Sequence, residues 1–294
     1  GQSMYEINQY NEVNIMGTSN LFQALSAKKV RLKKFILASS RSVYGEGKYE
    51  CPNHGVVYPD ARRVEDMKSG DFSMHCPVCN QKLKMLPTTE DSKITPNSLY
   101  AFTKYAQEKM VETMCRALNI EYTIFRFQNV YGVGQSLKNP YTGILSIFST
   151  LLLENKQINV FEDGLESRDF INVEDVADAV IRSLSEKKSD REIINLGSGI
   201  GTSVLEIAET LKRMYKSSSM ICVTGDFRIG DIAHNVADLS KARELLDFKP
   251  TIDLETGLQL FTAWVKNQEI DNSKYEKSLQ EMEQAGMFLR KGND

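Results

Sequence analysis

The chain has few of the residues that cross-link proteins: among 294 residues there are five cysteines and three histidines. An odd number of cysteines does not indicate a disulfide framework, which favours the cytoplasm as the compartment. Long apolar runs are missing too, because the longest stretch, 144–153, is interrupted by two serines and a threonine. A membrane-spanning helix needs about 20 mostly apolar residues, so no membrane association is expected.

An excess of positive charge is also absent. The 36 lysines and arginines face 39 aspartates and glutamates, which gives a formal net charge of −3. Nucleic-acid-binding domains are normally strongly basic, so this balance argues against a nucleic-acid partner. The hydrophobic fraction of 41% is ordinary for a globular protein and is sufficient for a substantial core.

The chain lacks the usual opening of nucleotide-binding α/β domains, which is a strand, a glycine-rich turn and a helix, with an acidic residue beyond. One glycine cluster, Gly197, Gly199 and Gly201, comes after a predicted strand, but its spacing does not match that pattern. Ser203 and Glu206 just after it are typical of a capping box, so we predict that an ordinary helix begins there.

The chain does contain an alternation of strand and helix signals, which favours an α/β fold. Short apolar or β-branched runs predict strands at 34–38, 122–127 and 192–196. Apolar residues at spacings of three and four predict a helix over 97–118, directly after a proline. The polar tail, 272–290, is expected to form a surface helix.

Residues 46–90 break this alternation, since they show little periodicity and contain four of the seven prolines. Here Cys51 and His54 are separated by 21 residues from Cys76 and Cys79, an array that can surround a tetrahedral Zn²⁺ ion. Four protein ligands leave no position for water, so the predicted zinc site is structural. His75 is a rival ligand, and four unligated residues in a polar loop are the alternative interpretation.

Zinc ribbons can also bind nucleic acid, so the charge of this segment matters. Within 46–90, seven acidic residues outnumber six basic ones. Phosphate binding needs a basic surface. We therefore predict that this zinc-ribbon-like insertion serves only to hold its own segment of chain together.

Tyr100 and Lys104 are four residues apart in the predicted helix, so their side chains share one face. A tyrosine has an ordinary pKa of about 10 and is a weak base at neutral pH, but a nearby lysine cation lowers that pKa. With a hydroxyl from the serine turn at 39–40, such a group can deprotonate a sugar alcohol while a nicotinamide accepts the hydride. By spacing alone, an amphipathic helix with a solvated lysine is the simpler interpretation.

Seven short segments occur in order along residues 1 to about 265: Asn14–Thr18, Ser39–Gly45, Ser98–Lys104, Arg126–Asn129, Arg168–Ile171, Asn195–Gly199 and Arg228–Asp231. In this order they resemble the extended short-chain dehydrogenase/reductase family, and among its members most closely the NAD-dependent nucleotide-sugar 4-epimerases. Residues 1–7 and the Cys/His insertion resemble the dTDP-L-rhamnose 4-epimerase branch of that family.

The resemblance implies a role for each matched residue. It makes Tyr100 the catalytic base, Lys104 its electrostatic partner and Ser40 the hydrogen-bond partner of the sugar hydroxyl. For the NAD cofactor it implies contacts from Asn14, Ser40, Tyr100, Lys104 and Gln128. For a nucleotide-diphosphate sugar it implies contacts from Ser42, Asn129, Arg168, Arg228 and Asp231. Without the motifs, surface ion pairs would be the simpler interpretation of the two arginines.

The two residues after Ser40 bear on the reaction type. Sugar dehydratases of the family carry an acidic pair there, whereas this chain has Arg41 and Ser42. This difference favours epimerisation, with dTDP-L-rhamnose or a UDP-hexose as substrate. The alternatives are a nucleotide-sugar dehydrogenase or dehydratase on the same scaffold, and a non-catalytic zinc-bearing fragment.

The resemblance implies an α/β, Rossmann-like doubly wound sheet with a smaller C-terminal substrate domain. Residues 1–130 are expected to form the C-terminal portion of the NAD-binding domain, interrupted by the insertion at 46–90. Residues 131–294 are expected to form mainly the substrate domain, with some segments returning to the sheet. Because the glycine-rich opening is absent, we expect a longer parent protein, and by family analogy we expect a homodimer.

Overall fold

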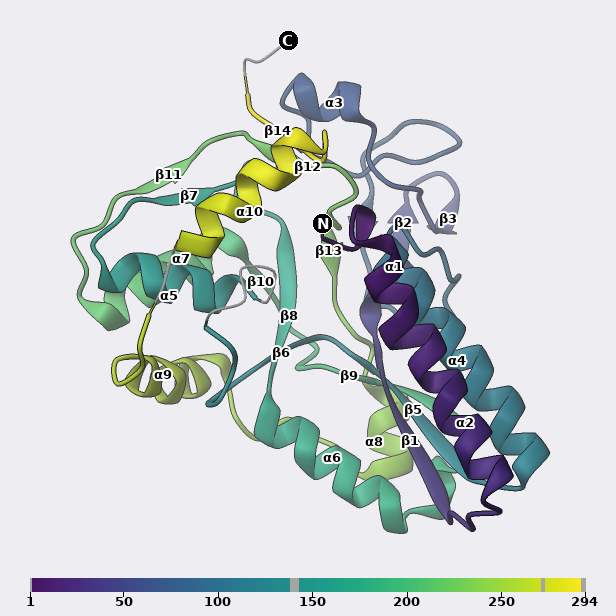
Figure 1. Cartoon of the computed structure of the whole chain (residues 1–294). Helices are drawn as coiled ribbons and strands as arrows, with labels where there is room; N and C mark the ends of the chain where they lie inside the picture. The colour runs from purple at the N-terminus through teal and green to yellow at the C-terminus, as the bar shows by residue number, and fades with distance from the viewer. Residues whose placement is uncertain (1, 138–142, 271–272, 292–294) are drawn as a thin grey trace.

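The computed structural model describes residues 2–137, 143–270 and 273–291 (Figure 1). At its centre, three parallel strands lie in the order β1 (Lys34–Ser40), β5 (Glu121–Phe127) and β9 (Glu192–Leu196). The sequence predicted all three, although β1 continues through Ser39 and Ser40. In register, Ser40 lies beside Phe127 and Phe127 beside Leu196, so the three carboxyl ends meet at one edge of the sheet.

Helices cover both faces of this sheet: α2 (Gly17–Ala27) and α4 (Leu99–Leu118) on one, α6 (Val173–Ser185) and α8 (Ser240–Leu246) on the other. Successive side chains of a strand point to opposite faces. Accordingly, Ile124 of β5 packs in one cluster with Val111 of α4, whereas its neighbour Phe125 packs in another with Val176 of α6. A parallel sheet covered on both faces is the Rossmann-like arrangement that the sequence predicted.

The helix that carries Tyr100 and Lys104 is α4. Ser98 caps its first turn by accepting a hydrogen bond from the Ala101 N–H at 3.2 Å, so the helix begins two residues later than predicted. It ends at Leu118, and Asn119 adopts the left-handed conformation with φ 53°. The chain from the N-terminus runs alongside α4 (Figure 1) through η1 (Gln2–Met4), α1 (Ile7–Tyr10), the π-helical turn η2 (Asn11–Met16) and α2.

A second hydrophobic core surrounds strand β8 (Ser167–Asn172). This strand pairs with β6 (Asn129–Tyr131), β10 (Gly201–Ser203) and β13 (His234–Asn235). Three helices pack apolar side chains around it: α5 (Ile144–Leu153), α7 (Val204–Tyr215) and α9 (Leu254–Val265). Two further pairs are β7 (Ile158–Val160) with β11 (Ile221–Val223), and β12 (Phe227–Arg228) with β14 (Phe288–Leu289). No helix of the described ranges could cross a membrane.

The predicted capping box begins α7. The Ser203 N–H donates to Glu206 Oε2 at 2.9 Å, and Ser203 Oγ accepts from the Glu206 N–H at 3.2 Å. These two bonds satisfy backbone groups that the start of a helix leaves free. The glycine cluster before it therefore leads into an ordinary helix, as the sequence indicated.

The C-terminal tail differs in part from its prediction. Asn272 lies outside the described residues, α10 covers Ser273–Gln284, and the chain then forms β14 instead of continuing as a helix. Met282 is only 3% exposed, and Tyr275 packs against the second core. The predicted surface helix is confirmed over 273–284, although it ends six residues earlier than expected and buries Met282 on its inner side.

The insertion at 46–90 has a small sheet of its own, in the order β3 (Gly55–Val57), β2 (Tyr49–Cys51) and β4 (Lys84–Met85). It is preceded by the short helix η3 (Arg41–Tyr44) and contains α3 (Val64–Lys68). Its apolar side chains form a cluster with Tyr49 and Met74 at the centre, which also includes Ala233 from the distant segment before β13. Of the remaining elements, η4 (Lys187–Ser189) leads into β9.

Candidate active site

Tyr100 and Lys104 lie in the first turns of α4 against the carboxyl end of β1. Lys104 Nζ donates a hydrogen bond to the Ala38 carbonyl at 2.9 Å and lies 6.0 Å from the centroid of the Tyr100 ring. Both side chains are half-buried. A lysine has three N–H donors, so Lys104 is fixed by one of them and keeps others for a ligand.

The serine turn lies beside them. Ser40 caps η3, and its Oγ accepts hydrogen bonds from the Ser42 N–H at 3.2 Å and from Ser42 Oγ at 3.0 Å. Ser40 is also close enough to Tyr100 to lower the pKa of that tyrosine. The fold thus brings together Ser40, Tyr100 and Lys104, which we call the tyrosine cluster.

Burial has the largest influence on the pKa values of Tyr100 and Lys104. Burial raises the pKa of Tyr100, which Ser40 and the charge of Arg41 offset only in part. Burial also lowers the pKa of Lys104, against the influence of Glu108. That Lys104 lowers the pKa of Tyr100 stays a prediction, because in this structure its ammonium group donates to the Ala38 carbonyl and desolvation favours the neutral form of both groups.

The two remaining residues predicted to contact the cofactor are also at this end of the sheet. Asn14, in the π-helical turn η2, donates to Thr103 Oγ1 of α4 at 3.0 Å. Gln128 comes directly after β5, and its Nε2 donates to Asn235 Oδ1 at 3.0 Å. Gln128 Oε1 is buried and has no hydrogen-bond partner among the described residues, so an acceptor is available at the carboxyl edge of the sheet.

Four of the five residues predicted to bind substrate line one pocket of about 290 Å³, which we call the arginine pocket: Asn129, Arg168, Arg228 and Asp231. Arg168 is anchored from behind, since it donates to the Ala233 carbonyl at 3.1 Å and lies 3.3 Å from Asp231 Oδ1. Arg228 stacks on Phe161 at 5.1 Å from the ring centroid. Its Nε is buried without a partner in the described part of the chain.

Positive charge dominates the arginine pocket. Burial raises the pKa of Asp231, but four guanidinium groups outweigh burial and hold that pKa below its usual range: those of Arg168, Arg228, Arg62 and Arg41. Guanidinium groups bind phosphate oxygens with paired, directed hydrogen bonds. The pocket therefore has the chemistry to hold a diphosphate.

The fifth residue, Ser42, lies instead with Ser40, and Arg41 between them is a site residue that the sequence analysis missed. Its Nε donates to Asn129 Oδ1 at 3.0 Å, and its Nη1 is buried without a partner in the ranges described. Burial and the charge of Arg168 lower the pKa of Arg41 to about 10. Arg41 thus connects the tyrosine cluster to the arginine pocket, and its position between two motif serines was the available signal.

Glu166 and α10 were also missed. Glu166 is 7% exposed and lines the arginine pocket. Burial, reinforced by the neighbouring charge of Glu162, raises its pKa to about 8. From α10, Tyr275 and Met282 complete the wall. Glu166 is two residues before Arg168, a spacing that places two side chains on one face of an extended segment. Nothing in the sequence connects Tyr275 and Met282 to the arginines, because packing alone brings them together.

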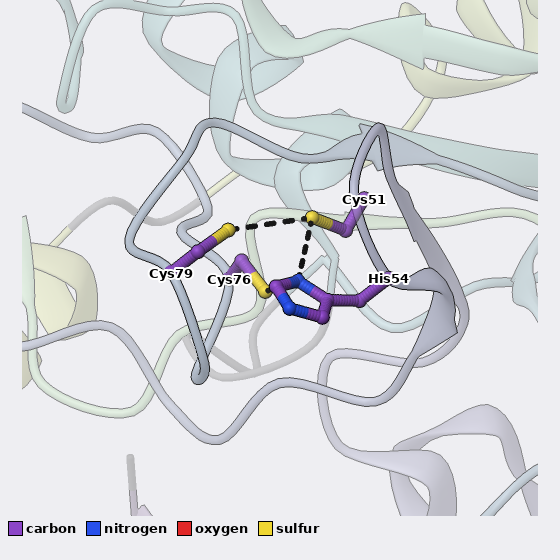
Figure 2. A group of neighbouring side chains, drawn as sticks. All are labelled: Cys51, His54, Cys76 and Cys79. Carbon is purple, nitrogen blue, oxygen red and sulfur yellow. Dashed lines mark hydrogen bonds between the residues drawn. The ribbon is translucent and has the colours of Figure 1, made fainter.

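The four predicted metal ligands do meet in space: Cys51, His54, Cys76 and Cys79 place their ligand atoms within 4.8 Å of one another (Figure 2). Cys51 Sγ is 3.5 Å from His54 Nδ1 and 3.6 Å from Cys79 Sγ, and His54 Nδ1 is 3.6 Å from Cys76 Sγ. Around a tetrahedral ion with Zn–S bonds of about 2.3 Å, neighbouring ligand atoms lie about 3.8 Å apart. The donor set and its spacing therefore fit zinc.

His75 is not part of this group. Its Nε2 lies 2.9 Å from Asp71 Oδ2, and its Nδ1 lies 3.0 Å from the Asn80 carbonyl. Both ring nitrogens are thus engaged elsewhere. The paired spacing in the sequence, and not proximity to Cys76, identified the histidine that joins the cluster.

Comparison with known proteins places this arrangement in a family. The model of the NAD dependent epimerase/dehydratase family matches residues 1–62 and 78–197. A dTDP-L-rhamnose 4-epimerase of Burkholderia thailandensis is 36% identical over 272 residues, which are 92% of this chain and 73% of that protein. A putative UDP-glucose 4-epimerase of Methanocaldococcus jannaschii is 32% identical over 257 residues, 87% of this chain and 70% of that protein.

Solved structures give the same result. A UDP-glucose 4-epimerase of Thermotoga maritima, with UDP-glucose, has a TM-score of 0.71 at 27% identity, covering 90% of this chain and 72% of that one. A UDP-glucuronic acid 4-epimerase of Bacillus cereus, with UDP-glucuronic acid and NAD, has a TM-score of 0.69 at 26% identity, covering 89% and 70%. The chain therefore belongs to the NAD-dependent epimerase/dehydratase family and is an NAD-dependent enzyme of the nucleotide-sugar epimerase type.

Proposed function

We propose that the protein inverts the C4 configuration of a nucleotide-diphosphate sugar by transient oxidation at that carbon. The observation that carries the proposal is the position of Arg41, which touches Asn129 of the arginine pocket and lies next to Ser40 of the tyrosine cluster. A proton-transfer group and a diphosphate-binding pocket are thereby adjacent. The related 4-epimerases support the same reaction.

NAD fits the carboxyl edge of the sheet. Dinucleotides bind at the carboxyl ends of parallel strands, and Lys104, Gln128 and Asn14 present donors and acceptors there, with Gln128 Oε1 buried and free among the described residues. When bound, NAD supplies reversible hydride transfer at the sugar carbon. These three residues would hold its nicotinamide half next to Tyr100.

The chain's own residues then have separate tasks. In its deprotonated form, Tyr100 Oη removes the proton of the C4 hydroxyl and later returns one, while Ser40 holds the same sugar oxygen by a hydrogen bond. Arg168 and Arg228 hold the diphosphate, so the flat 4-keto sugar can turn while its nucleotide stays bound. Elimination of water lacks its acid and base, because Arg41 and Ser42 occupy the positions after the turn.

The reaction is tested by incubating the protein with NAD and a panel of UDP-, dTDP- and GDP-sugars and identifying products by NMR. We expect a C4 epimer from one of them, with dTDP-L-rhamnose and UDP-hexoses as the first candidates because of the relatives named above. A 4-keto-6-deoxy product or net formation of NADH would instead identify the dehydratase or dehydrogenase alternative. No turnover of any sugar would favour a non-catalytic fragment.

We further propose that Cys51, His54, Cys76 and Cys79 bind a structural zinc ion. Support comes from their ligand atoms, which lie within 4.8 Å of one another. Four protein ligands complete the coordination of zinc and leave no position for water, as in structural sites. Elemental analysis is expected to find one zinc per chain in the wild type and a large loss in Cys76→Ser. A wild-type protein free of metal would contradict the assignment.

The central sheet ends at β1, which within the described residues pairs on one side only, with β5. We propose that further strands extend the sheet at β1 and carry the glycine-rich turn that holds the dinucleotide phosphates. Residues 1–130 would then be the C-terminal portion of the NAD-binding domain. Residues 131–294 would be mainly the substrate domain, with segments such as β9 returning to the sheet. The mass of the protein purified from its source is then expected to exceed 33.3 kDa. A folded, NAD-containing protein of that mass would contradict this.

A homodimer is proposed through the helices beside Tyr100. Apolar side chains are exposed there, with Val13 at 67%, Met16 at 56% and Phe102 at 53%. Exposed apolar side chains that gather on one part of a surface mark association sites. Phe102→Glu is expected to shift the mass by light scattering to that of a monomer, whereas Leu260→Glu, at 52% exposure on α9, should leave it unchanged.

A further inference from the structure

The Cys/His insertion packs against the segment that carries two residues of the arginine pocket. Phe72 of the insertion makes an edge contact with Phe227, at 6.2 Å between ring centroids, and Phe227 directly precedes Arg228. Tyr49 and Met74 pack on Ala233, two residues beyond Asp231. The insertion therefore forms the outer support of the pocket's most strongly charged wall.

One guanidinium group joins these parts. The Arg62 side chain is 3% exposed and forms a two-fold ion pair with Glu162, at 2.5 Å and 2.9 Å. It also donates to the Asp231 carbonyl at 3.0 Å and to the Phe72 carbonyl at 3.2 Å. The planar fork of an arginine can satisfy four such acceptors at fixed angles, which a lysine cannot.

Arg62 also acts on the pocket by its charge, since it is one of the four arginines that hold the pKa of Asp231 down. Arg62 would act on a ligand through Asp231, because Arg62 holds the Asp231 backbone and the Asp231 side chain faces the pocket. Truncating one partner of a buried ion pair leaves the other charge uncompensated. Loss of Arg62 would therefore release the Asp231 turn and leave Glu162 buried without its partner.

The position of Arg62 in the chain connects it to the metal ligands. Arg62 and Phe72 both lie in residues 55–75, the segment between the ligand pairs Cys51/His54 and Cys76/Cys79. A metal ion bound by both pairs would join the two ends of this segment and restrict its conformations. A bound metal ion would therefore also restrict the positions of Arg62 and Phe72, and Arg62 holds the Asp231 carbonyl.

We infer that Arg62 is a positioning residue for nucleoside-diphosphate binding, and that metal bound at the Cys/His cluster tightens this binding by holding residues 55–75 against the arginine pocket. This inference rests on the proposed function of the pocket. It assigns to the insertion a role in substrate affinity in addition to holding its own segment together.

The test is calorimetric titration of UDP and dTDP into the zinc-loaded protein. Arg62→Ala is expected to weaken the tighter of the two by about tenfold or more, and Arg62→Lys by less. Arg63→Ala is the matched control, because the neighbouring Arg63 is 63% exposed and pairs only locally, with Asp66. In turnover, Arg62→Ala should raise KM with kcat nearly unchanged, which a general loss of structure would not produce.

Metal removal provides the second measurement. Chelation of zinc from the wild type should weaken UDP binding to about the level of Arg62→Ala, and chelation from Arg62→Ala should weaken it little further, because both changes act through one contact. Arg62→Lys serves the same comparison if Arg62→Ala does not fold.

The outcomes separate this inference from the proposed function. Unchanged affinity in a folded Arg62 variant, or in the metal-free wild type, would overturn the inference while leaving the nucleotide pocket intact. A zinc-loaded wild type that binds neither UDP nor dTDP would overturn the proposed function and this inference with it.

Discussion

The tyrosine cluster and the arginine pocket lie next to each other, but burial has opposite consequences in them. In the tyrosine cluster, burial raises the pKa of Tyr100 and lowers that of Lys104, so both groups are shifted towards neutrality. In the arginine pocket, Asp231 is held as an anion because guanidinium groups outweigh burial. Loss of solvent thus favours the neutral forms in the tyrosine cluster, whereas in the arginine pocket the guanidinium groups keep the pKa of Asp231 low in spite of it.

The difference is one of partners. Ser40 and the charge of Arg41 offset the burial of Tyr100 only in part, whereas four guanidinium groups outweigh the burial of Asp231. A tyrosine hydroxyl can exchange a proton with the substrate, whereas fixed cations suit an anion that stays bound throughout. We therefore expect substitutions in the tyrosine cluster to change kcat and those in the arginine pocket to change affinity.

The largest expected effect is on the rate. Tyr100→Phe should lower kcat for C4 epimerisation by about 10²- to 10⁴-fold, since it removes the proton-transfer group, while the Kd for UDP changes little. Steady-state kinetics and calorimetry measure the two quantities. Tyr105→Phe, one turn further along α4 where the ring contacts Lys109, is the control and should behave as wild type. Substantial turnover by Tyr100→Phe would remove Tyr100 from its role.

A substitution in the arginine pocket should instead change the affinity for the nucleotide. Arg228→Ala should weaken UDP binding and raise KM by about 10- to 100-fold with little change in kcat, because a charged hydrogen-bond donor to the diphosphate is lost. Arg213→Ala, which removes a 63% exposed arginine paired with Glu255, should leave both constants unchanged. A fall in kcat without a rise in KM would break the proposed division between the two regions.

The electrostatics of the pocket can be tested through stability. The pKa of Glu166 is raised from 4.5 to about 8, so above its unfolded value the folded state holds a proton that the unfolded state has lost. Stability must then fall as pH rises between these values. Glu166→Gln has no proton to lose at this position. Its free energy of unfolding relative to the wild type should therefore rise by about 1.4 kcal/mol from about pH 5.5 to 6.5.

Urea unfolding at the two pH values measures this difference. Glu209→Gln, an exposed position on α7, is the matched control and should run parallel to the wild type. If the difference in free energy of unfolding between Glu166→Gln and the wild type does not change with pH, Glu166 is not held protonated in the folded pocket.

The smallest expected effect lies outside both regions. Ser203→Ala removes one half of the capping box of α7 and should lower the free energy of unfolding by about 1 kcal/mol. Turnover and UDP affinity should stay the same, which makes it a reference for stability loss alone. A change in affinity similar to that of Arg228→Ala would mean that general destabilisation reaches the pocket.

Much of the site could be predicted from the sequence where the relevant residues are close together in the chain. Tyr100 and Lys104 share a helix face because of helical periodicity, and Ser40 ends an apolar strand. What the sequence did not predict depends on contacts between distant segments. The direction of the Lys104 ammonium depends on the Ala38 carbonyl, 66 residues away, and the burial of Met282 depends on packing against the pocket.

The sequence by itself determined the central strands, the capped start of α7, the family and the four residues that meet in the Cys/His cluster, because these depend on short-range periodicity, local hydrogen bonds and motif order. Only the tertiary structure decided the direction in which the pKa of Tyr100 is shifted, the place of Arg41 between two sites and the bridge that Arg62 makes to Glu162 and Asp231. The physical reason is that desolvation and buried ion pairs depend on which segments meet in the folded chain, and spacing in the sequence carries no record of that.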